Sequence, residues 1–142
     1  MISDTQVVLR LFLAAALGGI IGFEREKHNR RIAGLRTHIL VSVGSALIML
    51  VSIYVFYSYT GKTAVDPARI AAGVVTGIGF LGAGTIIRSG ESVKGLTTAA
   101  SLWTVSGIGL AVGCGFYIAG WATTIIALAT LYLLRKIPIE DK

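Results

Sequence analysis

Long apolar runs alternate with short polar segments along the chain. Three of the runs have the length of a single helix: 7–23, which is apolar apart from Arg10, and the uncharged stretches 39–57 and 70–87. A hydrocarbon core about 30 Å thick is crossed by about 20 helical residues. Each of these three runs therefore predicts one membrane-spanning helix.

The fourth apolar run, 95–134, holds 40 residues without a charge. As a single helix it would reach about 60 Å, twice the thickness of the hydrocarbon core. We expect it to fold back once, at Gly113-Cys114-Gly115, because glycine permits the backbone conformations of a tight reversal. The sequence thus predicts an all-α polytopic membrane protein with one transmembrane domain over 1–142. Its five helices are expected at about 5–25, 36–58, 67–88, 96–112 and 115–135.

Composition agrees with a membrane protein. The chain is 54% hydrophobic and 14% charged, whereas soluble domains carry about 25% charged residues. The net charge of +6 does not indicate nucleic-acid binding, because the basic residues form short clusters between apolar runs and no continuous stripe with aromatics. The single cysteine, Cys114, predicts neither an internal disulfide nor a metal cluster.

The basic residues also predict the orientation. Three of the 13 lie on one side of the expected helices, namely Arg10, Lys62 and Arg69. The other ten lie on the opposite side: Arg25, Lys27, Arg30, Arg31, Arg36, Arg88, Lys94, Arg135, Lys136 and Lys142. Cytoplasmic loops of membrane proteins carry the excess of Lys and Arg. We therefore expect the N-terminus outside and the C-terminus in the cytoplasm.

Glycines are concentrated inside the expected helices. GxxxG pairs occur in three of them, and the third helix continues the pattern: Gly18 and Gly22; Gly73, Gly77, Gly79, Gly82 and Gly84; Gly109 and Gly113. In lipid, small residues favour helix association because they let backbones approach closely. We expect the first, third and fourth helices to form the packed centre, with the second and fifth facing lipid. An exposed glycine face would also favour a homo-oligomer, a dimer above all.

Residues 77–82 match G-x-G-x-x-G, the dinucleotide-binding fingerprint. That motif requires a preceding strand and an acidic residue about 20 positions later. Here it lies inside an uncharged run of membrane length, and Glu91 follows only nine positions after Gly82. Two interpretations remain: close helix packing, or a locally broken helix that lines a polar cavity.

A polar cluster is expected where the first helix ends and the second begins. It comprises Glu24, Arg25, Arg36 and Thr37, and we expect Thr97 and Thr98 at the start of the fourth helix to belong to the same functional cluster. Glu24 at a helix C-terminus and Arg36 at a helix N-terminus are both disfavoured by the helix dipole. We hypothesise that they form an ion pair at the cytoplasmic mouth. The alternative is that each side chain extends separately into the lipid headgroups.

Two further helix starts carry polar residues. Asp66 before Pro67 is typical of a helix N-cap, although Asp66 and Arg69 could instead contribute to cation entry from outside. Thr97 is a plausible N-cap for the fourth helix. The hydroxyls of Thr97, Thr98, Ser101 and Thr104 could also hydrogen-bond across helices, or back to carbonyls of their own helix.

No catalytic set is found in the sequence. His28 and His38 have no cysteine or carboxylate at metal-ligand spacing, and the serines of the second helix lack a nearby base. No carboxylate lies at the centre of an apolar run, where ion-coupled transporters usually carry one. We expect no enzyme and no cofactor, and the sequence identifies no metal ligands.

Five sequence blocks, in this order, resemble the MgtC/SapB family of bacterial membrane proteins. They are GGIIGFERE (18–26), AGLRTH (33–38), DPAR (66–69), GIGFLGAG (77–84) and GLTTAASLW (95–103). The resemblance covers nearly the whole chain. It implies a five-helix domain in the bacterial inner membrane, linked to growth in low magnesium and survival in macrophages. For some members it also implies inhibition of the F-type ATP synthase. By position, the motif residues are Glu24, Arg25, Arg36, Thr37, Asp66, Arg69, Thr97 and Thr98.

Members similar to this chain carry a cytoplasmic domain after the fifth helix, so we expect this sequence to correspond to their transmembrane domain. The leading hypothesis is a non-enzymatic membrane regulator that binds another membrane protein through its helices. The second is a divalent-cation (Mg²⁺) transporter or channel using Asp66 outside, Glu24 inside and a path along the glycine-rich third helix. A third, an enzyme acting on lipid, has no nucleophile in its favour.

Overall fold

The computed structural model describes residues 2–27, 32–61 and 66–134. Over these residues it contains five helices and one two-stranded hairpin. Their bounds are α1 Asp4–Lys27, α2 Leu35–Tyr59, α3 Pro67–Ala83, β1 Ile87–Ser89, β2 Ser92–Lys94, α4 Leu96–Cys114 and α5 Tyr117–Leu133. The predicted all-α fold with five helices is confirmed. By length and composition, α1, α2 and α4 could each cross a membrane, whereas α3 and α5 are shorter apolar helices of 17 residues.

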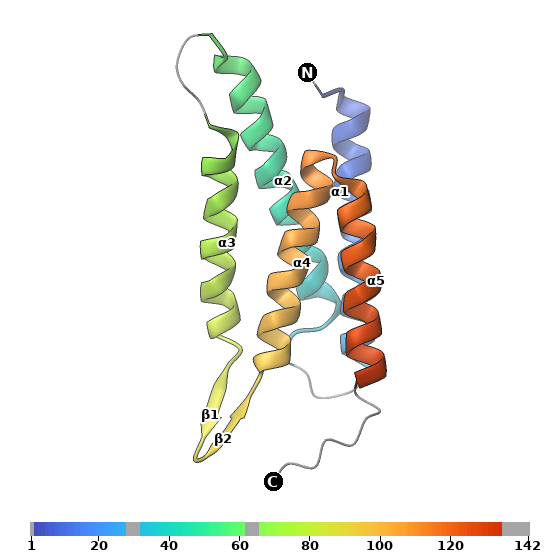
Figure 1. Cartoon of the computed structure of the whole chain (residues 1–142), viewed down its shortest axis with the longest axis vertical. Coiled ribbons are helices and arrows are strands. Elements are labelled where there is room, and N and C mark those ends of the chain that lie inside the picture. Colours follow the sequence, from blue (N-terminus) through green and yellow to red (C-terminus); the bar gives the residue numbers. More distant parts are fainter. Residues whose placement is uncertain (1, 28–31, 62–65, 135–142) are drawn as a thin grey trace.

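The five helices run up and down in sequence order (Figure 1). The end of α1, the start of α2 and the β1–β2 hairpin share one end of the molecule, called the hairpin end below. The start of α1 and the α4–α5 turn lie toward the opposite end. The orientation in a membrane stays a prediction. Several of the basic residues behind it lie outside the described residues: Arg30, Arg31, Lys62, Arg135, Lys136 and Lys142.

The long apolar run folds back where its length requires. α4 ends at Cys114, and Gly115 follows as its C-cap in the left-handed conformation, with φ +90°. The N–H groups of Gly115 and Phe116 return to the carbonyls of Val112 and Ala111 at 3.0 and 2.8 Å. This glycine-terminated pattern is a common helix ending, because a left-handed residue closes the last turn.

The third helix is shorter than predicted. It ends at Ala83 and not near 88, and an antiparallel hairpin follows, in which Ile87 pairs with Lys94 and Ser89 with Ser92. Thr85, Ile86 and Ile87 are β-branched residues, which favour strands, and Gly90 provides the positive φ of the hairpin turn. Hydropathy alone did not separate these residues from the helix before them.

The expected centre of the bundle is also wrong, because α2 lies between α1 and α4. On the α1 side, a Cβ added to Gly18 would lie 2.6 Å from Ser42 Cβ, and one added to Gly22 would lie 2.8 Å from Leu35 Cα. On the α4 side, a Cβ at Gly113 would lie 2.7 Å from the Ala46 carbonyl oxygen. The GxxxG glycines of α1 and α4 thus both pack on α2, whose serines and alanine offer a narrow surface. The apolar core around them is Ala14, Leu17, Ile21, Ala46, Val105, Ile108 and Val112.

Helix α3 packs along one side only, against α2 and α4. Its residues Gly73, Gly77 and Gly79 have nothing within 4 Å of an added Cβ, so the prediction that they pack against another helix is not met within this chain. Gly82 is the exception, at 3.6 Å from the Ala99 Cβ, while Gly84 meets only carbonyls of its own helix. The glycine-rich face of α3 is therefore mostly open.

Candidate functional site

A buried polar cluster joins α1, α2 and α4 at the hairpin end; it comprises Arg25, His38, Thr98 and Ser101. Arg25, in the last turn of α1, is only 2% exposed, and its Nη2 donates a hydrogen bond of 3.0 Å to Thr98 Oγ1. A guanidinium is always charged, and an interior charge is very costly without hydrogen bonds. Thr98 therefore contributes both to stability and to the position of α4 on α1.

His38 makes the second link of the buried polar cluster. Its ring is fully buried, with Nδ1 2.8 Å from the Gly34 carbonyl oxygen and Nε2 3.0 Å from Ser101 Oγ. Because a carbonyl only accepts, the proton between Nδ1 and Gly34 belongs to the imidazole. The Nε2 of this tautomer accepts, and the Ser101 hydroxyl has two acceptors in reach for its single proton: this Nε2 and the Thr98 carbonyl oxygen at 2.8 Å. The imidazole thus ties the first turns of α2 to the first turns of α4.

The ion pair hypothesised between Glu24 and Arg36 is not formed in the structure, where Arg36 is exposed and Glu24 is half-buried. Glu26 reaches the start of α2 instead: its Oε2 accepts a hydrogen bond of 2.6 Å from the Leu35 N–H. Gly34, the N-cap of α2, has no side chain to offer. A carboxylate at a helix N-terminus is favourable, so Glu26 compensates for the missing cap from the neighbouring helix.

The roles of His38 and Glu26 were not predicted, whereas both expected partners of Ser101, across helices and within its own helix, are in reach. The sequence did hold a signal for His38: His38, Ser42 and Ser45 recur at i, i+4 and i+7 in an otherwise apolar run. That spacing places polar groups on one face of a helix, which lipid would disfavour. All three are buried. Spacing could thus have shown that α2 faces protein on one side.

Two other residues of the predicted polar cluster, Thr97 and Thr37, lie outside the buried polar cluster. Thr97 is not the N-cap of α4, because Gly95 takes that position in the left-handed conformation, at φ +92°, without a side-chain cap. Thr97 lies inside the helix and is exposed, as is Thr37 in α2. Left-handed backbone favours glycine, and with Gly95 as the N-cap the helix begins at Leu96, two residues earlier than a cap at Thr97 would allow.

Asp66 and Arg69 lie toward the opposite end of the molecule, where α3 begins. Asp66 Oδ1 accepts a hydrogen bond of 2.8 Å from the Ala68 N–H, and Pro67 occupies the first helical position. This is the N-cap that the Asp-Pro pair indicates. Both Asp66 and Arg69 are exposed.

Arg10 fastens the α4–α5 turn to α1. Its Nη1 donates a hydrogen bond of 2.8 Å to the Gly113 carbonyl oxygen, and its Nε donates one of 3.0 Å to the Tyr117 hydroxyl. The guanidinium carbon lies 5.7 Å from the centre of the Tyr117 ring, within the range of cation–π attraction. A cation beside the last carbonyls of α4 also complements the helix dipole.

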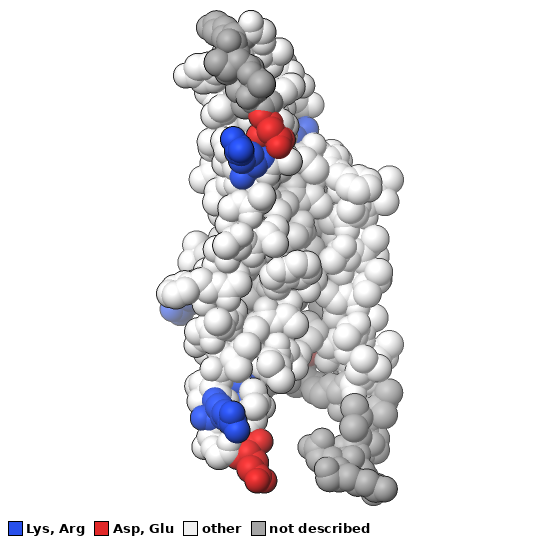
Figure 2. All heavy atoms as spheres, turned by 60° about the vertical axis from the view of Figure 1, so that its left-hand side comes forward, with Lys and Arg blue, Asp and Glu red and all other residues white. Residues whose placement is uncertain are grey.

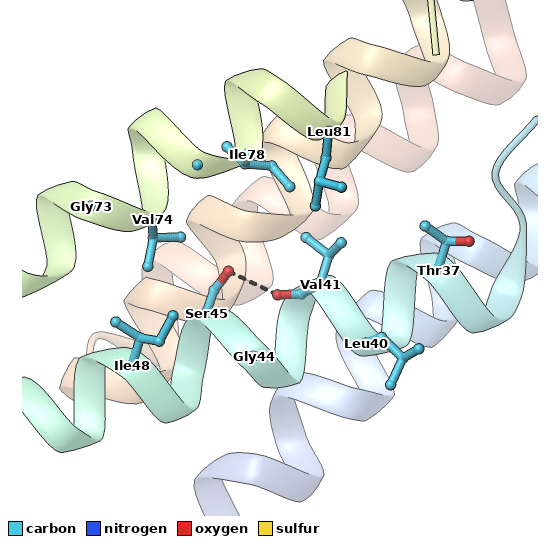
Figure 3. Close-up of a pocket in the computed structure, with 11 residues that line it drawn as sticks. Thr37, Leu40, Val41, Gly44, Ser45, Ile48, Gly73, Val74, Ile78 and Leu81 are labelled. Carbon is cyan, nitrogen blue, oxygen red and sulfur yellow. Dashed lines mark hydrogen bonds between the residues drawn. The ribbon is translucent and has the colours of Figure 1, made fainter. Parts of the chain in front are cut away.

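An apolar groove of about 540 Å³ runs between α2 and α3 (Figure 3). Its apolar lining includes Leu40, Val41 and Ile48 from α2 and Val74, Ile78 and Leu81 from α3. Ser45 lies in the groove, but its hydroxyl donates 2.8 Å to the carbonyl of Val41 in its own helix. Glycines widen both walls, because Gly44, Gly73 and Gly77 have nothing within 4 Å of an added Cβ.

In the part of the chain that the structure describes, no group of three or more His, Cys, Asp or Glu residues could hold a metal ion.

Comparison with known proteins places the chain in one family. The model of the MgtC family matches residues 11–138. The protein named "Putative magnesium transporter YhiD" from Escherichia coli K12 is 42% identical, over 93% of this chain and 62% of its own length. Protein MgtC from Salmonella typhimurium is 47% identical, over 91% of this chain and 52% of its own. Protein SapB from Bacillus subtilis is 38% identical, over 94% of this chain and 60% of its own.

The chain thus spans between half and two thirds of the length of these curated relatives. No solved structure matches it.

Proposed function

Because the chain belongs to the MgtC family, we propose that it is a non-enzymatic, multi-pass protein of the bacterial inner membrane that binds another membrane protein through its helices. Its role would lie in magnesium homeostasis or virulence, as the family resemblance implies. The F-type ATP synthase is one candidate partner. We further propose that the chain forms a homo-oligomer, with a dimer favoured.

The open outer face of α3 carries this proposal. Ala72, Thr76, Gly79 and Ala83, called the outer stripe below, recur at i, i+4, i+7 and i+11 and are all exposed. The opposite side of α3 holds the buried residues Val74 and Ile78. A stripe of small residues lets a second helix approach closely and gain dispersion contacts in lipid. The outer stripe is therefore suited to a transmembrane helix of a partner.

The buried polar cluster supports the same proposal. Hydrogen bonds through Arg25 and His38 tie α1, α2 and α4 together, while α3 packs only along one side. The Arg25 guanidinium is buried between α1 and α4 at the hairpin end. This position favours a joint between the two helices, and so a regulator, over a cation path there.

Complementation of growth in low magnesium tests the proposal, in a bacterial strain that depends on this chain. Gly79→Leu fills the outer stripe and should abolish complementation at an unchanged amount of protein in the membrane. Gly107→Leu is the matched control, because Gly107 is also exposed on a helix with nothing within 4 Å of an added Cβ. Full complementation by Gly79→Leu would contradict the proposal.

A divalent-cation transporter is the second candidate, favoured by the name of the Escherichia coli relative. Asp66 and Glu24 lie toward opposite ends of the bundle, as an entry and an exit carboxylate would. Magnesium flux into liposomes holding the purified chain tests this candidate. Saturable flux that falls in Asp66→Asn and Glu24→Gln would replace the regulator proposal, and absence of flux would remove the transporter.

A further inference from the structure

The α2–α3 groove combines an apolar channel with a basic end. Its volume of about 540 Å³ lies within the range of sites for small molecules. Most of its lining atoms are apolar, and glycines on both walls leave room where larger side chains would close it. A groove of this shape, running along the helices, fits an extended hydrocarbon chain.

Polar groups gather where the groove approaches the hairpin end. Thr37 lines the groove nearest to the start of α2 (Figure 3). Arg36 precedes Leu40 by four residues and therefore lies on the same face of α2, one turn closer to the helix start. Arg36 is exposed and makes no hydrogen bond or ion pair with any residue that the structure describes.

The surrounding charges leave Arg36 available to an anion. The Glu26 carboxylate already accepts the Leu35 N–H. Arg88 and Lys94 of the hairpin are exposed at the same end, together with Glu91 at its tip. Figure 2 shows basic and acidic residues together at that end, below a largely uncharged middle. An arginine fork matches phosphate oxygens in geometry and charge.

We propose that the α2–α3 groove binds an anionic phospholipid. One acyl chain lies along the apolar lining past Gly44, Gly73 and Gly77. The lipid phosphate lies at the start of α2, where the Arg36 guanidinium and the Thr37 hydroxyl donate hydrogen bonds to it. This site is separate from the outer stripe of α3, so a result that contradicts one of the two proposals leaves the other unaffected.

Native mass spectrometry of the full chain, released from nanodiscs of equal parts phosphatidylglycerol and phosphatidylcholine, tests the proposal. The wild type should retain phosphatidylglycerol in excess. Arg36→Gln should lower that excess about tenfold, because it removes charge-assisted hydrogen bonds to phosphate. Lys94→Gln, which removes a cation from the same end, should leave the excess nearly unchanged. Equal retention of both lipids by the wild type, or equal effects of Arg36→Gln and Lys94→Gln, would overturn it.

A matched pair of glycine variants tests whether an acyl chain lies in the groove. Gly77→Leu fills the groove and should reduce retention of both lipids, whereas Gly107→Leu adds the same side chain at an exposed glycine of α4 that does not line the groove and should not. Circular dichroism shows that each variant is folded, and Gly73→Leu replaces Gly77→Leu if that variant is not. Unchanged lipid retention in the folded groove variant would contradict the proposal.

Discussion

Replacing Gly18 by alanine tests the close packing of α1 on α2. The new Cβ would lie 2.6 Å from Ser42 Cβ and 2.8 Å from the His38 carbonyl oxygen, against an ordinary contact of at least 3.4 Å. The two helices must separate by about 0.8 Å to relieve this contact. A gap of 0.5–1 Å forfeits about a quarter to a half of the dispersion attraction, and overpacking typically costs about 1–3 kcal/mol.

Gly19→Ala is the control for this prediction, because its Cβ would lie at an ordinary 3.4 Å from Ile39 Cγ1. Both variants gain the same helix propensity, about 1 kcal/mol for alanine over glycine. The difference between their Tm values therefore reports the cost of the close contact between α1 and α2. Thermal unfolding in detergent, followed by the fluorescence of Trp103 and Trp121, should give Gly18→Ala a Tm several degrees below that of Gly19→Ala. Equal Tm values for the two variants would refute the packing of α1 on α2.

Three further substitutions test individual hydrogen bonds. Thr98→Val removes one hydrogen-bond acceptor of the buried Arg25 and should lower the free energy of unfolding by about 1–3 kcal/mol, while Thr97→Val at the exposed neighbour should not; an equal Tm for the two would contradict the buried polar cluster. Glu26→Ala removes the acceptor of the Leu35 N–H and should cost about 1 kcal/mol, measured as faster hydrogen exchange in the first turn of α2; unchanged exchange would exclude the cap. Arg10→Gln loses both Gly113 and Tyr117 as partners and should lower the Tm more than Tyr117→Phe, which loses one; the reverse order would contradict the clamp on the α4–α5 turn.

The number of helices could be predicted from the sequence because run length is a strong constraint. Lipid cannot satisfy backbone hydrogen bonds, so each apolar run forms helix, and a run of 40 residues must turn. The turn at Gly115 followed from that argument. The hairpin at 87–94 did not, since hydropathy does not distinguish an apolar strand from the end of an apolar helix.

The arrangement of the helices was harder to predict, because glycine patterns show that a helix packs closely but not on which neighbour. Gly18 and Gly113 both pack on α2. We had expected this helix to face lipid because it is rich in leucine and isoleucine. The polar cluster was predicted only in part, for a related reason: of its six residues, Arg25 and Thr98 are hydrogen-bonded to each other. Arg25 and Arg36 both stand near the same end, and only the three-dimensional arrangement shows that Arg25 is buried on Thr98 while Arg36 is exposed.

Photo-crosslinking along α3 in native bacterial membranes tests the central claim most directly. A photoreactive amino acid is placed in turn at Thr76, Gly79 and Ala83 of the outer stripe and at the buried positions Val74 and Ile78. We expect adducts with another protein chain that follow the helical period, present at the outer stripe and absent at the buried positions. Adducts of equal yield at all five positions, or none at the outer stripe, would contradict the claim that α3 binds a partner helix.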